Sequence, residues 1–239
     1  MWDNFGKQLY DNIIKEGRLG LYWDGLKNTL YLTLGAAVIG IILGSLVAIA
    51  KVYLKNKKKS GSPLRRFLDK LLGAMCDLYL TVIRGTPMMV QLLIMGFVIF
   101  ASSRNFTMIG TLTLGINSGA YVSEIVRGGL MSVDKGQMEA GRSLGLNYMT
   151  TMRFIVIPQA VKAILPALGN EFIILLKDTS LITVIGGKEL LYAAQGIYNR
   201  TYEQMFPLIG TAALYLVLVI ILSWLLGKLE RRLRQSDRR

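Results

Sequence analysis

Histidine is absent from the 239 residues, and cysteine occurs once, as Cys76. Without histidine, imidazole-based zinc sites and catalytic Ser-His-Asp or Cys-His groups are excluded. A single cysteine excludes a disulfide within the chain, and no Gly-rich phosphate loop of the Walker type occurs. We therefore expect no catalytic residue, no metal ligand and no bound cofactor in this chain.

Apolar residues dominate what is present, at 52% of the sequence. About 20 apolar residues in a helix span the hydrocarbon core of a bilayer. Runs of this kind occur at residues 29–50, 88–101, 106–126, 154–176 and 206–226. The sequence predicts an all-α, polytopic membrane protein with about five transmembrane helices.

The second run is short, and an apolar helix expected over residues 67–83 precedes it. Between them stands Arg84-Gly85-Thr86-Pro87, where proline removes a backbone donor and glycine loosens the helix. Backbone left unpaired at membrane depth must lie beside protein or a water-filled cavity. Two arrangements stay open: one bent element that enters the bilayer obliquely, or an interfacial helix followed by a short span.

Basic residues give the chain a net charge of +13, and they gather in two segments. Residues 51–70 hold eight Lys or Arg against one acid, and residues 227–239 hold six against two. Such clusters face the cytoplasm in membrane proteins, so we expect the N-terminus outside, the C-terminus inside and no nucleic-acid partner. We divide the chain into an interfacial amphipathic segment (1–27), a transmembrane domain (28–227) with a cytoplasmic loop at 131–150, and a basic tail (228–239).

That loop contains a long spaced motif: Glu139-Ala140-Gly141, three residues, Gly145, nine residues, then Ile155-Val156-Ile157-Pro158. It resembles the "EAA" loop of ABC-importer permeases, with Gly141 replacing the second alanine and Ile157 a leucine. The resemblance implies a coupling helix that fits a groove on a separate ATPase subunit. The residues implicated are Glu139, Ala140, Gly141, Arg142 and Gly145.

Local chemistry fits a short helix in this loop. Asp134 is suited to cap its start, and Gly145 to end it in the left-handed conformation. Ala140 and Gly141 lack bulk and allow a partner surface to approach closely. Glu139 and Arg142 are three residues apart, so they are placed to pair with each other or with that partner. A solvated connector with an ordinary ion pair is the alternative.

Three further stretches resemble the polar-amino-acid branch of these permeases, the histidine/glutamine/arginine type. They are Arg84-Gly85-Thr86-Pro87 with Val90-Gln91, the run from Ala120 to Gly129, and Asn170-Glu171 with residues 176–181. The resemblance implies a multi-pass protein of a prokaryotic inner membrane. It also implies a second permease copy or homologue, two subunits that bind ATP and Mg²⁺, and an extracytoplasmic substrate-binding protein.

Acidic residues inside spans are costly and are usually functional or paired. Glu124, Glu171 and Asp178 fall in or near the predicted third and fourth spans. With Thr86 they are our candidates for lining the path of an amino acid, whose ammonium group carboxylates bind. Ion pairs are the competing interpretation, because Arg127 follows Glu124 by three residues and Lys177 adjoins Asp178.

Two other classes of protein remain as alternatives. An ion-coupled secondary transporter or channel would be favoured by paired inverted repeats, which we do not find. An intramembrane enzyme would have only carboxylates and lysines for its chemistry. The sequence does not indicate which amino acid is carried.

Overall fold

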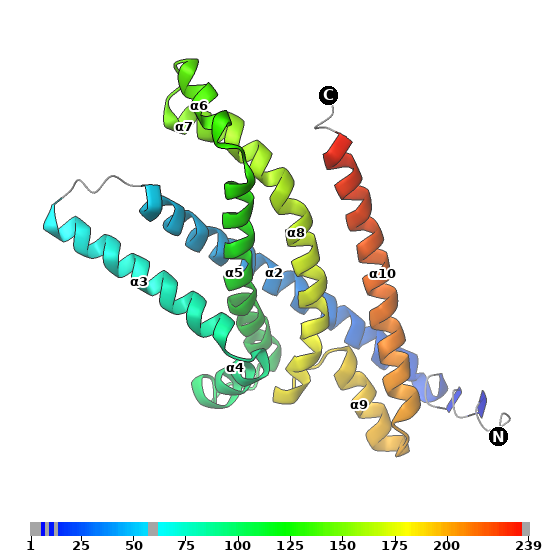
Figure 1. Ribbon diagram of the computed structural model, residues 1–239. Helices are drawn as coiled ribbons and strands as arrows, with labels where there is room; N and C mark the ends of the chain where they lie inside the picture. The colour runs from blue at the N-terminus through cyan, green and yellow to red at the C-terminus, as the bar shows by residue number, and fades with distance from the viewer. Residues whose placement is uncertain (1–5, 8–9, 12–13, 57–61, 236–239) are drawn as a thin grey trace. The chain divides into compact units, whose positions relative to one another are not determined.

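The computed structural model describes residues 6–7, 10–11, 14–56 and 62–235, and within these ranges it contains helices and no strand (Figure 1). This confirms the predicted all-α fold class. The longer helices are α2 (Arg18–Asn56), α3 (Pro63–Gly85), α5 (Phe106–Ser132), α8 (Ile157–Asp178), α9 (Leu190–Thr201) and α10 (Met205–Gln235). The shorter ones are η1 (Lys15–Gly17), α4 (Met88–Ile94), η2 (Met95–Ile99), α6 (Lys135–Ser143), α7 (Tyr148–Thr151), η3 (Met152–Val156) and η4 (Thr179–Ile185).

Three helical stretches of the described chain are long and apolar enough to cross a membrane: Arg18–Lys55, Tyr148–Ile185 and Met205–Leu233. A fourth qualifies only when Pro63–Gly85 and Met88–Ile99 count as one span. Helix α5, our predicted third span, is 27 residues long but is not among these stretches. It buries Thr113, Ser118 and Ser123, and a helix face packed against protein needs no apolar side chains. The count of five spans and their orientation stay predictions.

The break predicted at Arg84-Gly85-Thr86-Pro87 is confirmed. Helix α3 ends at Gly85 and α4 begins at Met88, with Thr86 and Pro87 both extended (ψ of 146° and 137°). Proline at this position has no N–H for the helix ladder and disfavours helical backbone in the residue before it. How α3 and α4 lie in a bilayer stays a prediction.

The predicted boundary at residue 27 does not coincide with a break in the helix. Helix α2 begins at Arg18 and continues through the predicted first span. Residues 57–61 of the first basic segment and residues 236–239 of the tail lie outside the described ranges. The three segments proposed from the sequence therefore stay predictions.

The chain forms two compact units. Unit one comprises Met1–Val38, Pro87–Gly115 and Phe172–Leu225, and unit two comprises Ile39–Thr86, Ile116–Glu171 and Leu226–Arg239. The main apolar cluster of unit one contains Leu32, Leu92, Ile109, Leu114, Leu175, Ile182 and Ile185. The cluster of unit two contains Val47, Cys76, Leu80 and Ala120.

Small residues allow helices to approach closely in both units. A Cβ atom at Gly35 would lie 2.8 Å from a methyl of Thr111 in unit one. In unit two, a Cβ at Gly44 would lie 2.6 Å from the carbonyl oxygen of Gly119. Close backbone approach of this kind is how helices associate in membranes, where hydrophobic burial gives no net drive.

Candidate functional site

The short helix predicted in the 131–150 loop exists as α6, at the tip of unit two (Figure 1), and its coupling role stays a prediction. Asp134 caps its start, because the carboxylate accepts a hydrogen bond of 2.6 Å from the Gly136 N–H. Such a cap satisfies one of the four N–H groups that a helix start leaves without partners. The capping role predicted for Asp134 is confirmed.

The helix ends at a Schellman motif centred on Gly145. Gly145 has a φ of +79°, in the left-handed region. Its N–H donates to the Arg142 carbonyl, and the Leu146 N–H donates to the Gly141 carbonyl, both at 3.0 Å. These two bonds satisfy carbonyls at the helix end, and a side chain at position 145 would strain the backbone. The predicted end of the helix at Gly145 is confirmed.

Gly141 has a role within the protein that the motif did not predict. It is buried, and a Cβ atom there would lie 2.5 Å from the Thr151 methyl carbon of α7. Asn147 holds α7 in place, since its side chain accepts from the Thr150 N–H at 2.8 Å. The missing side chain at Gly141 therefore allows α6 and α7 to pack together, and the residue does not lie on the exposed face.

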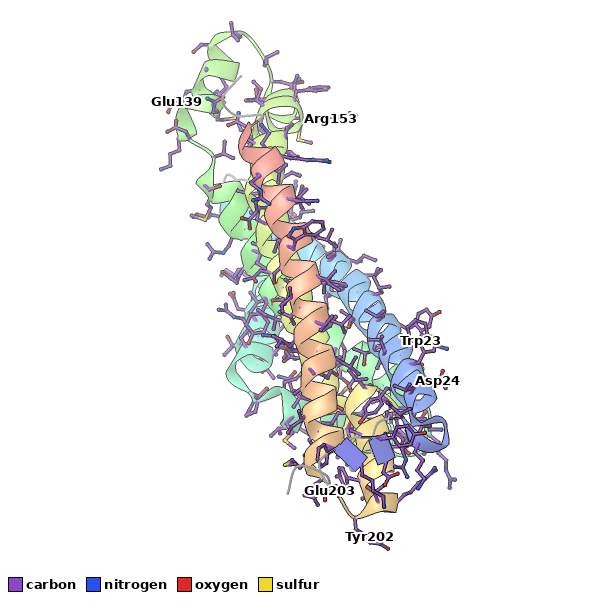
Figure 2. The ribbon with its side chains drawn as sticks, turned by 90° about the vertical axis from the view of Figure 1, so that its right-hand side faces the viewer. Trp23, Asp24, Glu139, Arg153, Tyr202 and Glu203 are labelled. Carbon is purple, nitrogen blue, oxygen red and sulfur yellow. The ribbon has the colours of Figure 1, made fainter. Side chains whose placement is uncertain are left out.

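The exposed face of α6 carries Glu139, Ala140 and Arg142, and Figure 2 labels Glu139 on this helix. Glu139 and Arg142 make no ion pair with each other or with any other residue that the structure describes. Leu144 at the end of the helix is 79% exposed. Two unpaired charges beside an exposed leucine form a surface suited to contact another protein.

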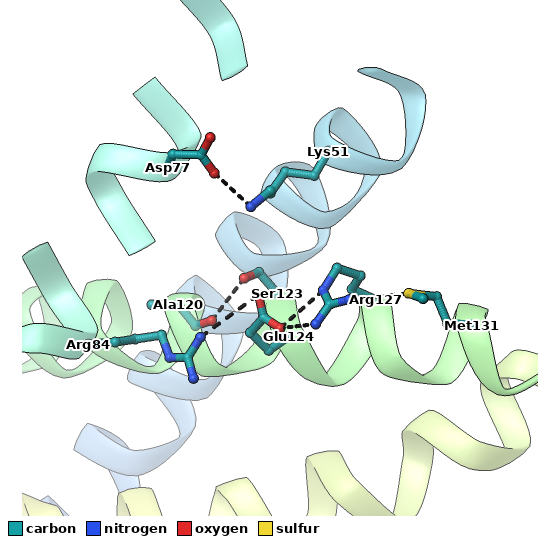
Figure 3. Close-up of polar contacts among 8 residues, drawn as sticks. All are labelled: Lys51, Asp77, Arg84, Ala120, Ser123, Glu124, Arg127 and Met131. Carbon is teal, nitrogen blue, oxygen red and sulfur yellow. Dashed lines mark hydrogen bonds and ion pairs between the residues drawn. The ribbon is translucent and has the colours of Figure 1, made fainter. Parts of the chain in front are cut away.

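A second group of polar side chains surrounds Glu124 on α5 (Figure 3). The Arg127 guanidinium donates to the Glu124 carboxylate through Nε, at 3.0 Å, and through a terminal nitrogen. Arg84, from the end of α3, lies 3.8 Å from the other carboxylate oxygen and over the Tyr121 ring. The ion pair with Arg127, which the spacing indicated, is confirmed. An incoming ammonium would have to compete with two guanidinium groups at Glu124.

Glu171 on α8 is a buried acid of unit two. The Ser118 hydroxyl of α5 donates to the Glu171 carboxylate at 2.7 Å, and Glu171 is 9% exposed. Sequence reasoning missed Ser118, whose role depends on the contact between α5 and α8. Helix α8 continues unbroken from Glu171 to Asp178, so the seven-residue spacing places both on one face of the helix.

The other two candidates for the substrate path are placed as follows. Asp178, at the end of α8, is half-buried and makes no hydrogen bond or ion pair with the rest of the described chain. Thr86 is exposed, and its hydroxyl donates to the Val82 carbonyl at 2.8 Å.

Glu189, just before α9 in unit one, is a buried acid that sequence reasoning missed. It is 1% exposed and accepts from the N–H groups of Leu191 and Tyr192, at 2.8 and 2.7 Å. The Tyr215 hydroxyl donates to it at 2.9 Å, and the Thr183 hydroxyl donates as well. Burial raises the pKa of Glu189, and these hydrogen bonds oppose the rise. The one signal for Glu189 in the sequence was its position directly before an apolar helix.

No set of three or more Cys, Asp or Glu residues in the described ranges is arranged to hold a metal ion. Described acids of both units accept from hydroxyl, guanidinium or backbone donors, and Asp77 pairs with the Lys51 ammonium. Such groups bind and orient polar ligands or other subunits.

Residues 40–235 match the family of the binding-protein-dependent transport system inner membrane component. The chain is 37% identical over 213 residues to a putative glutamine transport system permease protein, GlnP, of Rickettsia bellii, with 88% of this chain and 91% of the relative covered. It is 36% identical to the arginine transport system permease protein ArtQ of Bacillus subtilis, covering 90% and 93%. For GlnP of Escherichia coli the identity is 34%, covering 88% and 92%.

Solved structures agree with this assignment. An amino acid ABC transporter crystallised with histidines shares 41% identity and a TM-score of 0.79, covering 90% of this chain and 94% of that one. The MetNI methionine ABC transporter has a TM-score of 0.72 at 18% identity, covering 92% and 99%, and supports the fold alone. The chain belongs to the inner-membrane permease family of binding-protein-dependent ABC importers, in its amino-acid-transporting branch.

Proposed function

We propose that this chain forms the translocation path for a polar amino acid, and that α6 couples this path to ATP hydrolysis on a separate subunit. Relatives named for glutamine and for arginine transport support a polar amino acid as substrate, and the arginine relative supports a cationic one. The observation that carries the proposal is the capped helix α6, which presents exposed Glu139, Ala140 and Arg142, and the two charged side chains make no ion pair within the described chain. No feature of the described structure favours an ion-coupled carrier or a channel.

The assembly that follows is a pair of permeases, this chain with a second copy or a homologue, two ATP-binding subunits and an extracytoplasmic binding protein. ATP and Mg²⁺ belong to the ATPase subunits in this proposal. The membrane is the inner membrane of a prokaryote, with α6 in the cytoplasm and the turn at Tyr202 outside. Cysteines placed at Arg142 and Tyr202, with Cys76 replaced by Ala, test the orientation. An impermeant thiol reagent should label only the cysteine at 202 in intact cells.

Glu139→Lys tests the coupling role. The substitution reverses a charge on the exposed face of α6, where no other described residue pairs with it. In proteoliposomes with the ATPase and binding protein, we expect uptake to fall by about tenfold or more, the equivalent of about 1.4 kcal/mol of lost docking energy. Membrane insertion should stay at the wild-type level.

Asp24→Lys is the matched control, since Asp24 is an exposed acid of unit one, at 70% side-chain exposure. It should leave uptake unchanged. Uptake by Glu139→Lys at the wild-type rate, with the ATPase still stimulated by the loaded binding protein, would remove the coupling role of α6.

Glu171→Gln tests the substrate path. Glu171 is a buried acid that accepts from the Ser118 hydroxyl, and an acid at membrane depth is usually functional or paired. The half-saturating substrate concentration should rise by about tenfold for arginine or lysine and by less for glutamine, because only the former bring a side-chain cation. Affinity of the binding protein, measured separately, is the control. Unchanged saturation curves for all these amino acids would make Glu171 structural.

A further inference from the structure

Two hollows adjoin at one end of unit two. One, of about 450 Å³, is lined by Lys51, Lys55, Glu124, Arg127 and neighbouring apolar residues. The other, of about 610 Å³, is almost wholly apolar and is lined by Ile49, Tyr53, Tyr148, Met149 and Ile157 among others. Val52, Leu130 and Met152 line both. A charged hollow and an apolar one therefore share a wall.

The charged hollow has an excess of positive charge. Lys51 pairs with Asp77 at 2.7 Å, and Arg127 pairs with Glu124. Lys55 is exposed and has no hydrogen bond or ion pair with the described part of the chain. A cationic side chain that its own protein leaves unpaired, beside a hollow, favours an anionic ligand.

The apolar hollow has the features of a site at a membrane interface. Tyr53 and Tyr148 are exposed, and tyrosine is enriched where the headgroups meet the hydrocarbon. The Arg65 guanidinium donates to the Tyr53 hydroxyl at 3.2 Å, which adds a second cation near this hollow. Apolar side chains with cations beside them match a molecule that has an anionic head and a hydrocarbon tail.

The backbone between the hollows is also unusual. Residues Met152–Val156 form a π-helical turn, and both its first and last residues line the charged hollow. Turns of this kind inside α-helices are rare and are frequent at functional sites, because the added residue displaces side chains from the regular helix faces. Met152, the first residue of this turn, lines both the charged hollow and the apolar hollow.

We propose that unit two binds an anionic phospholipid at this end, with its phosphate beside Lys55 and an acyl chain in the apolar hollow. Basic pockets between helices on the cytoplasmic side of a membrane bind such headgroups. The site adjoins α7, which packs on the proposed coupling helix through Thr151 and Gly141. A bound lipid therefore stabilises the base of the coupling loop.

Lipid retention tests the proposal independently of transport. The full chain is extracted from bilayers of equal parts phosphatidylglycerol and phosphatidylcholine, and retained lipids are counted by native mass spectrometry. Wild type should retain phosphatidylglycerol preferentially. Lys55→Gln should reduce this preference by about fivefold, the ratio that corresponds to about 1 kcal/mol for one cation near an anionic surface.

Lys70→Gln is the matched control, because Lys70 is an exposed lysine of the same basic segment that lines neither hollow. It should retain the wild-type preference. Val52→Trp places a larger side chain in the wall that the two hollows share, which reduces their volume, and should reduce retention of both lipids. If wild type shows no preference for phosphatidylglycerol, or if Lys70→Gln loses it as Lys55→Gln does, the proposal fails. Unchanged retention of both lipids by Val52→Trp would also overturn it.

Discussion

Glu189 in unit one and Glu124 in unit two are both carboxylates held between helices, but their partners differ in kind. Glu189 is 1% exposed and accepts only from neutral donors, two backbone N–H groups and two hydroxyls. Glu124 has 26% of its side chain exposed and is contacted by two guanidinium groups. Neutral donors do not balance a buried charge, whereas guanidinium groups do. The stability contributed by the Glu189 site should therefore depend on its protonation, and that of the Glu124 site on the presence of its arginine partners.

The donors also differ in what they join. The partners of Glu189 come from η4, the start of α9 and the middle of α10, so one carboxylate ties three segments of unit one. Leu190, the next residue, donates its N–H to the Thr29 hydroxyl of α2 at 3.2 Å. At Glu124 the main partner, Arg127, lies one turn away on the same helix. Stability of the fold should depend much more on Glu189 than on Glu124.

Glu189→Ala is expected to have the largest effect. It leaves the hydroxyls of Thr183 and Tyr215 and two N–H groups of α9 without their acceptor, at about 1–3 kcal/mol for each unsatisfied buried group. We expect the free energy of unfolding to fall by about 3 kcal/mol or more, read as a lower midpoint of thermal unfolding in detergent.

Glu203→Ala supplies the comparison, because Glu203 also precedes a helix, α10, but accepts from the Met205 N–H at a long 3.4 Å. Its effect should be below about 1 kcal/mol. Equal midpoints for the two variants would mean that the buried network of Glu189 contributes nothing beyond a helix cap.

The pH dependence of stability separates charge from hydrogen bonding at Glu189. Burial raises the pKa of this group, so the folded protein binds its proton more tightly than the unfolded chain does. Protonation therefore stabilises the fold at low pH, and this contribution is lost as pH rises through the raised pKa. Each unit by which the pKa is raised corresponds to about 1.4 kcal/mol.

The Glu189→Gln variant cannot titrate at this position. As pH rises from about 4, the ordinary pKa of a glutamate, the unfolding midpoint of wild type should fall relative to that of the variant. A difference that stays constant from pH 4 to 8 would show that the carboxylate has the same pKa in the folded and the unfolded chain. It would also remove the contrast drawn with Glu124.

The smallest effects are expected at the arginines around Glu124. Arg127 and Arg84 are 39% and 45% exposed, and pairs with this exposure contribute about 1 kcal/mol or less. Arg127→Gln should lower the free energy of unfolding by about 1 kcal/mol, because it removes two hydrogen bonds. Arg84→Gln, at 3.8 Å, should lower it by less. Thermal unfolding of both variants tests this order, and a larger loss for Arg84→Gln would contradict it.

Local signals in the sequence predicted those features whose causes are local. Asp134 caps α6 and Gly145 ends it because cap and left-handed turn are set within a few residues. The break before Pro87 and the pair of Glu124 with Arg127 follow from spacing in the same way. Each was read from residues no more than four apart.

Features set by contacts between distant segments were not predicted. Glu189 is bound by Tyr215, 26 residues later, and its position before an apolar helix does not indicate this contact. Gly141 was assigned to a surface that contacts a partner. The motif does not indicate that Thr151, from the next helix, packs against it. Ser118 was missed as a partner of Glu171 because 53 residues separate them.

The capping of both ends of α6 has a kinetic consequence. With Asp134 at its start, the Schellman bonds at its end and a hydrogen bond of 3.1 Å from Gln159 to Gln137, the helix is already formed before any partner arrives. Docking then requires little ordering of backbone, and preorganised surfaces bind without that entropic penalty. A subunit that engages and releases α6 in every transport cycle would meet the same surface each time, so its exchange would be set by contact chemistry and not by refolding of the loop.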